Sequence, residues 1–497
     1  MEGFRAAAAK LYTERMMEHT QAATPIWDAL LRHAEIERVS VHVPGHKAGQ
    51  GLPGAFAACA RRLARLDATE LPGLDDLHAP RDAILQAEQL AARAWGSDHT
   101  FFLVGGSTAG NLAALLATLR PGDQAVVPRN AHQSVWHGLK LARAQAVVVT
   151  PDTAPYGVPG AVPPERIARA LAEFPRVSAI VVISPTYHGI VSALPAIVRL
   201  GRANNIPVIV DEAHGAHLSF HPQLPMSGVQ AGADIVVQSA HKMLPALTQT
   251  ALLHLNGGRV GIDRMRDWLR VVQTSSPSYL LLASLDSARA QLATEGADLI
   301  GKAIGRLAAA ARRLEATAPG LVNAGAAGAR QDPFKWTVSS LLLGMSGYET
   351  ERALRERFGV FAELSHENHV LFAWSYANSR RDVDAVSEAL RKLAEEGGEK
   401  RMRPPETRGI PAGWSADAVL IDAQQETSSA PLTISLHKAV GKRMAAPLTP
   451  YPPGIPCVLP GETLSPTVCE MVLRMLDQGV RVDGLADSEE PSVHCWE

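Results

Sequence analysis

Between about Val39 and Leu314, short runs of β-branched and aliphatic residues alternate with longer stretches in which apolar residues recur with helical spacing. The short runs predict strands, and the clearest are Ala125–Val127, Ala146–Thr150, Ala179–Ser184, Val208–Asp211 and Ile235–Gln238. Helices are expected between some of them, at Pro163–Phe174 and Leu194–Asn205. Because strands that alternate with helices build a mostly parallel sheet covered on both faces, the pattern predicts an α/β protein.

The chain outside this region has other patterns. Residues 1–38 predict a helical arm, with helical spacing of the apolar residues in Ile26–His33. A long helix is expected from Leu282 to about Ala318, and a small α+β domain follows it. The strands and helices expected in that domain are Lys335–Leu343, Gly347–Phe358, Val370–Ser375 and Arg381–Glu396.

Glycine, proline and charged residues mark a linker after the small domain. Beyond it we expect two helices, Pro431–Leu448 and Ser465–Gln478, around the proline-rich segment Tyr451–Pro456. The predicted organisation is therefore a helical arm (1–38), a large domain (39–314), a small domain (315–396), the linker (397–409) and a C-terminal domain (410–497).

A lysine closely follows one of the predicted buried strands. The strand Ile235–Gln238 leads through Ser239 and His241 to Lys242. An ammonium is costly to desolvate beside a buried strand, so the pKa of this lysine should fall. Its neutral amine can then act as a nucleophile. Such an amine can hold an aldehyde cofactor as a Schiff base, while the neighbouring hydroxyl and imidazole bind the phosphate of that cofactor. The alternative is an ordinary strand end with a solvated lysine.

Asp211 ends a second predicted buried strand, Val208–Asp211. Open α/β sheets bind their ligands at the carboxyl ends of their strands, where this carboxylate is expected. In pyridoxal phosphate enzymes an acid pairs with the pyridine nitrogen, because the protonated ring is the electron sink that stabilises a carbanion. A carboxylate that only caps the next helix would look the same in sequence. The presence of Lys242 further along the chain favours the cofactor interpretation.

Two further segments complete an ordered set. A glycine-rich turn at Gly105–Gly106 precedes a predicted helix, where backbone N–H groups and the hydroxyls of Ser107 and Thr108 suit an anion. His132 follows the strand Ala125–Val127, a position from which an imidazole can stack on a pyridine ring. Alone, such turns and histidines are often only structural. In the order turn, histidine, aspartate and lysine, they predict pyridoxal 5'-phosphate as the cofactor.

Composition narrows the remaining classes of protein. The 497 residues carry 48 Lys and Arg against 50 Asp and Glu, which leaves no electrostatic footprint for nucleic acid or an anionic membrane. The N-terminus has no signal-peptide pattern, and no run approaches the ~18 apolar residues of a membrane span. The four cysteines are scattered, as expected for reduced thiols in the cytoplasm. His214 and His217 have no evident partner ligands, so no metal is expected.

Together the motifs resemble the Orn/Lys/Arg decarboxylase family, the fold type I pyridoxal phosphate group that decarboxylates basic amino acids. They run in family order from about Thr24 to about Gly479. The matching segments are His42–Lys47, Glu70–His78, Gly106–Asn111, Asn130–His132, Ser184–His188, Asp211–His214, Ser239–Lys242, Ser275–Tyr279, Tyr451–Pro456 and Pro460–Glu462. The large inducible bacterial members carry a flavodoxin-like wing before this core, which begins almost at once here. The resemblance is therefore to the shorter arginine or lysine decarboxylase subgroup, and the wing-dependent decamers of the large members are not implied.

The resemblance implies an aspartate-aminotransferase-like large domain and a role for each residue of the ordered set. Lys242 would hold the cofactor, Asp211 would keep its ring nitrogen protonated, and His214 would lie near its phenolic oxygen and the leaving carboxylate. His132 and Ala213 would pack on opposite faces of the ring. The implied phosphate ligands are Ser107, Thr108, Ser239 and His241, with Ser275 and Ser276 reaching the phosphate of a neighbouring subunit in a homodimer.

The substrate expected from the resemblance is a basic amino acid, arginine first and then lysine or ornithine, whose amine product feeds polyamine synthesis. Glu462 is the candidate for its distal cation, because a buried carboxylate needs a cationic partner; a turn acid before Thr463 would look the same. Another fold type I reaction, such as that of an aminotransferase or a carbon–carbon lyase, stays open. An aminotransferase would clamp the α-carboxylate with a small-domain arginine, for which the candidates are Arg352, Arg355 and Arg357. A regulatory protein without activity would not need the lysine, aspartate and histidine.

Overall fold

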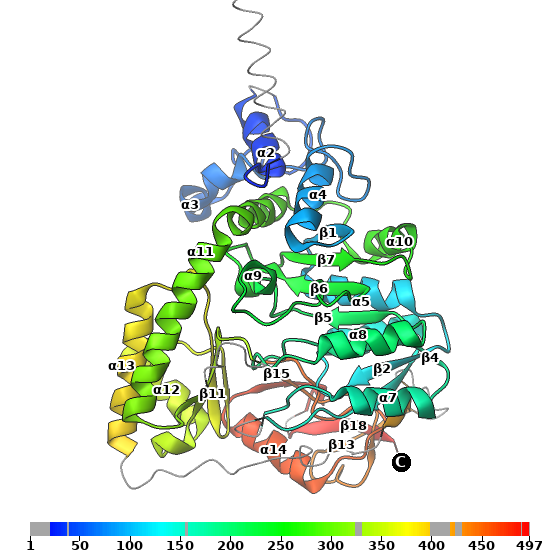
Figure 1. Ribbon diagram of the computed structural model, residues 1–497, viewed down its shortest axis with the longest axis vertical. Coiled ribbons are helices and arrows are strands. Elements are labelled where there is room, and N and C mark those ends of the chain that lie inside the picture. Colours follow the sequence, from blue (N-terminus) through cyan, green and yellow to red (C-terminus); the bar gives the residue numbers. More distant parts are fainter. Residues whose placement is uncertain are drawn as a thin grey trace, which may run out of the picture. The chain divides into compact units, whose positions relative to one another are not determined.

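Figure 1 shows the computed structural model, which describes residues 20–36, 39–154, 158–323, 331–397, 418–422, 430–488 and 490–496. The chain divides into two compact units, each combining segments that are distant in sequence. Unit 1 consists of Met1–Ala113, Glu212–Pro222 and Met226–Gly301. Unit 2 consists of Ala114–Asp211, Gln223–Pro225 and Lys302–Glu497. The consecutive domains expected from the sequence are a different division of the chain and stay a prediction.

Parallel strands form the sheet of unit 2. β2 (Gln124–Pro128) pairs with β3 (Gln145–Val149) on one side and with β4 (Val177–Ile183) on the other, and β4 pairs with β5 (Val208–Asp211). Every residue of β2 and β5 is buried, which is typical of parallel strands covered on both faces. These strands lie within two residues of the predicted positions, because each is a continuous apolar run.

Helices cover these strands (Figure 1). α7 (Pro164–Glu173) packs on β2 and β3, and α8 (Leu194–Ala203) packs on β5. β12 (Val419–Asp422) adds an antiparallel edge strand beside β3. The predicted α/β class with a mostly parallel sheet is therefore confirmed, as are both predicted helices.

In unit 1, one strand is paired on both sides, and its two neighbours run in the same direction as each other. β1 (His99–Leu103) and β6 (Ile235–Ser239) are each antiparallel to β7 (Ala251–Leu255). The last residue of β1 and the last residue of β6 both pair with Ala251. The segments that follow these two strands therefore start from the same level of the sheet.

The helices of unit 1 begin with α2 (Pro25–Glu35), which packs on α4 (Ala83–Trp95), and α4 packs on β1 in turn. α3 (Gly54–Ala64) and α10 (Ile262–Val272) belong to the same unit. The long helix predicted from Leu282 is α11 (Tyr279–Thr317), whose last residues belong to unit 2.

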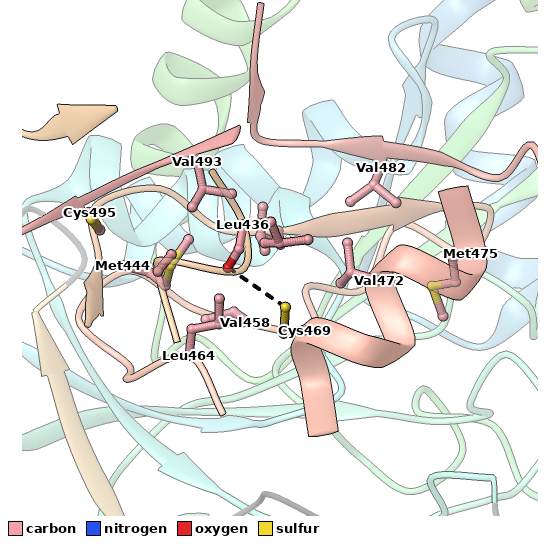
Figure 2. Close-up of a cluster of buried hydrophobic side chains, with 12 residues drawn as sticks. Leu436, Met444, Val458, Leu464, Cys469, Val472, Met475, Val482, Val493 and Cys495 are labelled. Atoms are coloured by element: carbon pink, nitrogen blue, oxygen red, sulfur yellow. Dashed lines mark hydrogen bonds between the residues drawn. The ribbon is translucent and has the colours of Figure 1, made fainter. Parts of the chain in front are cut away.

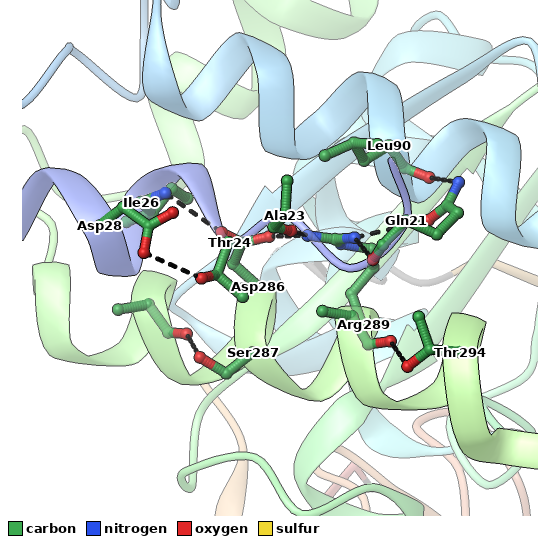
Figure 3. Close-up of polar contacts among 12 residues, drawn as sticks. Gln21, Ala23, Thr24, Ile26, Asp28, Leu90, Asp286, Ser287, Arg289 and Thr294 are labelled. Carbon is green, nitrogen blue, oxygen red and sulfur yellow. Dashed lines mark hydrogen bonds and ion pairs between the residues drawn. The ribbon is translucent and has the colours of Figure 1, made fainter. Parts of the chain in front are cut away.

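A buried ion pair on α11 holds the N-terminal segment of unit 1 (Figure 3). Arg289 pairs with Asp286, and both side chains are fully buried. Arg289 also donates to the carbonyls of Gln21, at 2.7 Å, and Ala23, while Asp286 accepts from the backbone N–H of Ile26 at 3.1 Å. Within the predicted helical arm, the described helix begins at Pro25, because the carbonyls of Gln21 and Ala23 bond to Arg289 instead. Residues 1–19 lie outside the described part, so the arm itself stays a prediction.

A second, antiparallel sheet in unit 2 forms most of the predicted small domain. Its order is β10-β11-β9-β8, with strands Leu364–His366, His369–Ala373, Lys335–Ser339 and Val322–Asn323. The predicted helices are α12 (Gly347–Phe358), which begins at a capping box of Ser346 and Glu349, and α13 (Arg380–Gly397). The strand expected to reach Leu343 is shorter, because Leu341–Leu343 forms a 3-10 turn.

The C-terminal part of unit 2 has a core of its own (Figure 2). α14 (Pro466–Asp477), the helix predicted at Ser465–Gln478, begins with the side chain of Ser465 as its cap. Its buried residues meet those of the surrounding strands in a cluster of Leu436, Ala439, Met444, Leu448, Val458, Leu464, Cys469, Val472, Met475, Val482, Val493 and Cys495. Two further short strands, β15 (Thr449–Tyr451) and β16 (Arg481–Asp483), pair beside this core.

The predicted helix Pro431–Leu448 is wrong. This stretch contains β13 (Leu432–Ser435) and β14 (Arg443–Met444), joined by a turn, and both strands pair with β18 (Ser492–Trp496). Pairing with a strand about sixty residues later overrides the local helical spacing, as is common for short segments. The predicted linker at 397–409 lies almost wholly outside the described residues. Among the described helices, none has the length and apolar character needed to cross a membrane.

We predict that Asp286→Asn will destabilise the protein by about 3 kcal/mol, because it leaves the fully buried Arg289 guanidinium without its counter-charge. A matched control is Asp263→Asn, which removes the acid of another i,i+3 pair, with Arg266, on the surface of α10. That change should cost no more than about 0.5 kcal/mol. Urea unfolding of both variants measures the difference. Equal losses of stability would contradict the role given to the buried pair.

Candidate active site

In unit 1, the loop before β7 connects the glycine-rich turn to the segment that carries the lysine. The N–H of Gly106, the first residue of α5 (Gly106–Thr118), donates to the carbonyl of Gln249 at 2.7 Å. The next carbonyl, that of Thr250, accepts from Ala240 N and from His241 Nδ1, both at 3.0 Å. The backbone at Gln249–Thr250 therefore fixes the start of α5 and the residues after β6 relative to each other.

This arrangement brings two predicted phosphate ligands together. Ser107 lies in the first turn of α5, and Ser239 is the last residue of β6. Their hydroxyl oxygens are 2.7 Å apart. Two hydroxyls beside the N–H groups of a helix start suit an anion. Of the other predicted ligands, Thr108 is exposed in the first turn of α5, and His241 is half-buried.

Lys242 lies in α9 (Ala240–Met243), a single helical turn after β6, rather than in the strand end itself. Its side chain is exposed, so the desolvation expected from the sequence is wrong and the amine is instead accessible from the surface of unit 1. Lys242 Nζ is 3.3 Å from Nε2 of His214, an imidazole that is only 5% exposed. An accessible amine beside a buried imidazole can bind an aldehyde and exchange a proton with its neighbour.

In unit 2, two predicted residues follow parallel strands at their carboxyl ends. Asp211 ends β5 opposite Ile183, the last residue of β4, and is 4% exposed. His132 follows β2 and caps the helix α6 (Gln133–Ala142), where its Nδ1 accepts the N–H of Ser134 at 3.2 Å. The acceptor role of Nδ1 favours the tautomer with its proton on Nε2.

The chain itself connects Asp211 to the lysine. Glu212, the next residue, donates its N–H to the carbonyl of Val237 in β6 at 2.8 Å. Its buried carboxylate accepts from Gly228 N at 2.8 Å and from Gln238 Nε2 at 2.7 Å, which anchors the backbone at this point. Ala213 and His214 follow directly. Asp211 is therefore three residues from the imidazole that contacts Lys242.

Glu462 is already paired in the structure. Its two carboxylate oxygens accept from Arg129 Nε at 3.1 Å and from a terminal nitrogen of Arg129 at 2.8 Å, and the N–H of Leu459 also donates to it at 2.7 Å. Arg129 was not expected from the sequence to have a role. Its position directly after the strand that precedes His132 was the available signal.

Other predicted residues lie on the surface. Ser275 and Ser276 are exposed in the loop before α11, with Ser276 Oγ 3.3 Å from the hydroxyl of Thr274. Of the arginines considered for an α-carboxylate clamp, Arg355 pairs with Glu351 on α12 at 3.0 Å. Arg357 pairs with Glu396 at 2.6 Å. These two surface ion pairs give no support to the aminotransferase alternative.

A buried cluster of histidines in unit 2 was not expected from the sequence. His188 Nε2 is 3.0 Å from His369 Nε2, and the ring of His369 stacks on that of His366. Burial, with smaller effects of His366 and Lys335, lowers the pKa of His188 to about 3. His188 is therefore neutral at physiological pH. The only signal in the sequence was its place in the segment Ser184–His188.

The donors present fit pyridoxal phosphate. The hydroxyls of Ser107 and Ser239 suit its phosphate, the amine of Lys242 suits its aldehyde, and the buried carboxylate of Asp211 suits its ring nitrogen. An α/β fold with groups of these chemical types is what an enzyme that uses pyridoxal phosphate needs.

Comparisons with known proteins identify the family. The Orn/Lys/Arg decarboxylase major domain matches residues 24–328, and the C-terminal domain of that family matches 421–481. The arginine decarboxylase of Bacillus subtilis (strain 168) is 36% identical over 483 residues, which cover 94% of this chain and 97% of that protein. The chain belongs to the Orn/Lys/Arg decarboxylase family and is a pyridoxal phosphate-dependent carboxy-lyase.

Solved structures share the fold. The lysine decarboxylase LdcF of Francisella novicida has a TM-score of 0.78 at 18% sequence identity, over 95% of this chain and 80% of that chain. A serine palmitoyltransferase with pyridoxal phosphate has a TM-score of 0.50 at 16% identity, over 63% of this chain and 76% of that chain. The predicted fold type, family and cofactor are therefore confirmed.

Proposed function

We propose that this enzyme decarboxylates arginine, with lysine and ornithine as the alternative substrates, and that its amine product feeds polyamine synthesis. The observation that carries the proposal is the contact of Lys242 Nζ with His214 Nε2 at 3.3 Å, three residues after Asp211. Arginine is placed first because the Bacillus subtilis relative, similar over nearly the whole chain, is named an arginine decarboxylase. The predicted cytoplasmic location is part of the same proposal.

In this proposal the residues around Lys242 bind and orient the cofactor. Lys242 would hold the cofactor through its aldehyde group, and Ser107, Thr108, Ser239 and His241 would hold its phosphate. When bound, pyridoxal phosphate supplies an electron sink for the pair of electrons left by departing CO₂. Asp211 would keep the ring nitrogen protonated for that purpose, and its burial at 4% exposure would keep water from competing for the bond.

The ring itself would be held between two side chains. His132 would stack on one face, and Ala213, small and two residues past Asp211, would pack on the other. The bond to CO₂ would break most readily with the substrate's carboxylate out of the ring plane, an orientation that the site would impose by gripping the substrate elsewhere.

His214 and Lys242 move the proton. His214 is buried, and its Nε2 lies within hydrogen-bonding distance of Lys242 Nζ, so the two groups can exchange a proton without bulk water. After CO₂ has left, Lys242 or His214 delivers a proton to the α-carbon of the substrate.

Glu462 was predicted to bind the distal cation of the substrate, and this stays a prediction. The structure gives its carboxylate a different cationic partner, Arg129, on both oxygens. A substrate guanidinium would have to share the carboxylate with Arg129 or replace it.

Carbon dioxide release from arginine, lysine and ornithine tests the proposed substrate. We expect kcat/KM for arginine to exceed that for lysine by about tenfold or more, since a site built for a planar guanidinium leaves donors or acceptors unpaired with an ammonium. The three amino acids should be compared in parallel on the same preparation of holoenzyme. A higher kcat/KM for lysine or ornithine would contradict the assignment of arginine.

Asp211→Asn should lower kcat by roughly 10³-fold, because the amide cannot stabilise the positive charge on the ring nitrogen. His132→Ala should cost much less, since stacking affects the placement of the ring and not its electronics. Single-turnover decarboxylation with saturating pyridoxal phosphate compares the two variants. Near-wild-type turnover in both would show that neither segment serves the cofactor.

The predicted homodimer is also part of the proposal. Unit 1 exposes large apolar side chains, and their contact with water is unfavourable. Among them are Val39 at 89%, Val41 at 88% and Phe56 at 62% exposure. On α3 only Ala57 and Ala64 are buried. A second copy of the chain would cover such a surface. The exposed Ser275 and Ser276 would then reach the cofactor phosphate of the partner, and the active sites would lie at the subunit boundary.

Phe56→Lys should weaken the dimer and lower activity in proportion to the fraction of monomer. Phe361→Lys is the matched control, because Phe361 is 77% exposed but lies in the other unit. Sedimentation equilibrium over a range of protein concentrations measures both. A fully active monomer, or equal effects of the two substitutions, would contradict this part of the proposal.

A further inference from the structure

The proline-rich segment Pro450–Glu462 packs against the strand end that carries His132, and both belong to unit 2. The N–H of Gln133 donates to the carbonyl of Gly454 at 2.9 Å. The N–H of Gly454 in turn donates to the carbonyl of Pro450 at 2.9 Å, which closes a tight turn. Residues more than three hundred positions apart are thereby fixed next to each other.

The guanidinium of Arg129 holds the remainder of this segment. Its side chain is only 4% exposed. It donates to both oxygens of Glu462, at 3.1 and 2.8 Å, and to the carbonyls of Pro456 and Cys457, at 2.7 and 3.0 Å. The buried guanidinium of Arg129 needs the carboxylate of Glu462 as its counter-charge. Because any other position of the segment Pro450–Glu462 would break this ion pair, the bonds to Arg129 strongly favour the observed position.

The imidazole of His132 is contacted on two edges. On one edge its Nδ1 accepts the N–H of Ser134 at 3.2 Å. On the other edge lies Gly454, where a Cβ would be 2.8 Å from Nε2 and 3.0 Å from Cδ2 of the ring. A side chain at position 454 would therefore displace the imidazole, and the φ of +78° at Gly454 also favours glycine.

We infer that the segment Pro450–Glu462 positions His132 for its contact with the cofactor. Gly454 sets the place of the imidazole, and the ion pair between Arg129 and Glu462 holds Gly454. This inference rests on the proposed stacking of His132 on the pyridoxal phosphate ring. Arg129, Gly454 and Glu462 are then positioning residues, and Glu462 acts through Arg129 rather than on the substrate.

The substitution Gly454→Ala tests the contact, with Gly479→Ala as its matched control. Gly479 has nearly the same φ, +75°, but a Cβ there meets no atom within 4 Å, so the control carries the same backbone strain without touching His132. Gly454→Ala should weaken pyridoxal phosphate binding to the apoenzyme about fivefold to tenfold and change the visible circular dichroism of the bound cofactor. Gly479→Ala should change neither. Equal effects of the two substitutions would overturn the inference.

The same substitution in a His132→Ala background separates this inference from the proposed function. With the imidazole gone, Gly454→Ala should have almost no further effect on cofactor affinity. A full additional loss in that background would overturn the positioning role while leaving stacking intact. If His132→Ala alone left both the affinity and the dichroism unchanged, the stacking role itself would fall.

Glu462→Gln tests the ion pair without adding bulk near His132. The positioning role predicts a changed dichroism of the bound cofactor and a weaker affinity for it. It also predicts a KM for arginine that stays within about twofold of wild type once pyridoxal phosphate is saturating. A large rise in KM with an unchanged cofactor signal would overturn the positioning role and support direct binding of the substrate's cation.

Discussion

The pairing of two strands with β7 is the constraint on which the rest of unit 1 depends. β1 and β6 both end opposite Ala251, so the glycine-rich turn and the lysine segment leave the sheet at one level. The two carbonyls just before β7 then bond to both segments. A shift of one residue in either pairing would turn the last strand residue to the other face and separate Ser239 from Ser107.

The chain supplies the second constraint, between Asp211 and His214. Glu212 anchors this short stretch through its N–H, which donates to the carbonyl of Val237, and through its carboxylate, which accepts from Gly228 N and Gln238 Nε2. The carboxylate of Glu212 is therefore bound to backbone and amide donors of unit 1, whereas Asp211 is the acid that ends β5. Glu212 and Asp211 are adjacent in sequence, and the hydrogen bonds of Glu212 to Gly228 and Gln238 give it a structural role.

Much of the fold was predictable because short, continuous apolar runs such as those of β2 and β5 are typical of strands that are buried on both faces of a sheet. The stretch Pro431–Leu448 was not, since its structure depends on β18, which only the folded chain brings near. The positions of the glycine turn, His132, Asp211 and Lys242 at or after strand ends were predictable from the apolar runs before them, and their common role stays a prediction. The partner of Glu462 was not, because Arg129 lies 333 residues away in sequence.

The central claim is that Lys242 is the lysine that binds the cofactor. Reduction of the holoenzyme with borohydride makes the bond between lysine and cofactor permanent, and peptide mapping by mass spectrometry then locates the pyridoxyl group. We predict that it is found on the peptide that contains Lys242. Labelling of another lysine, for example the buried Lys335, would contradict the account of the active site.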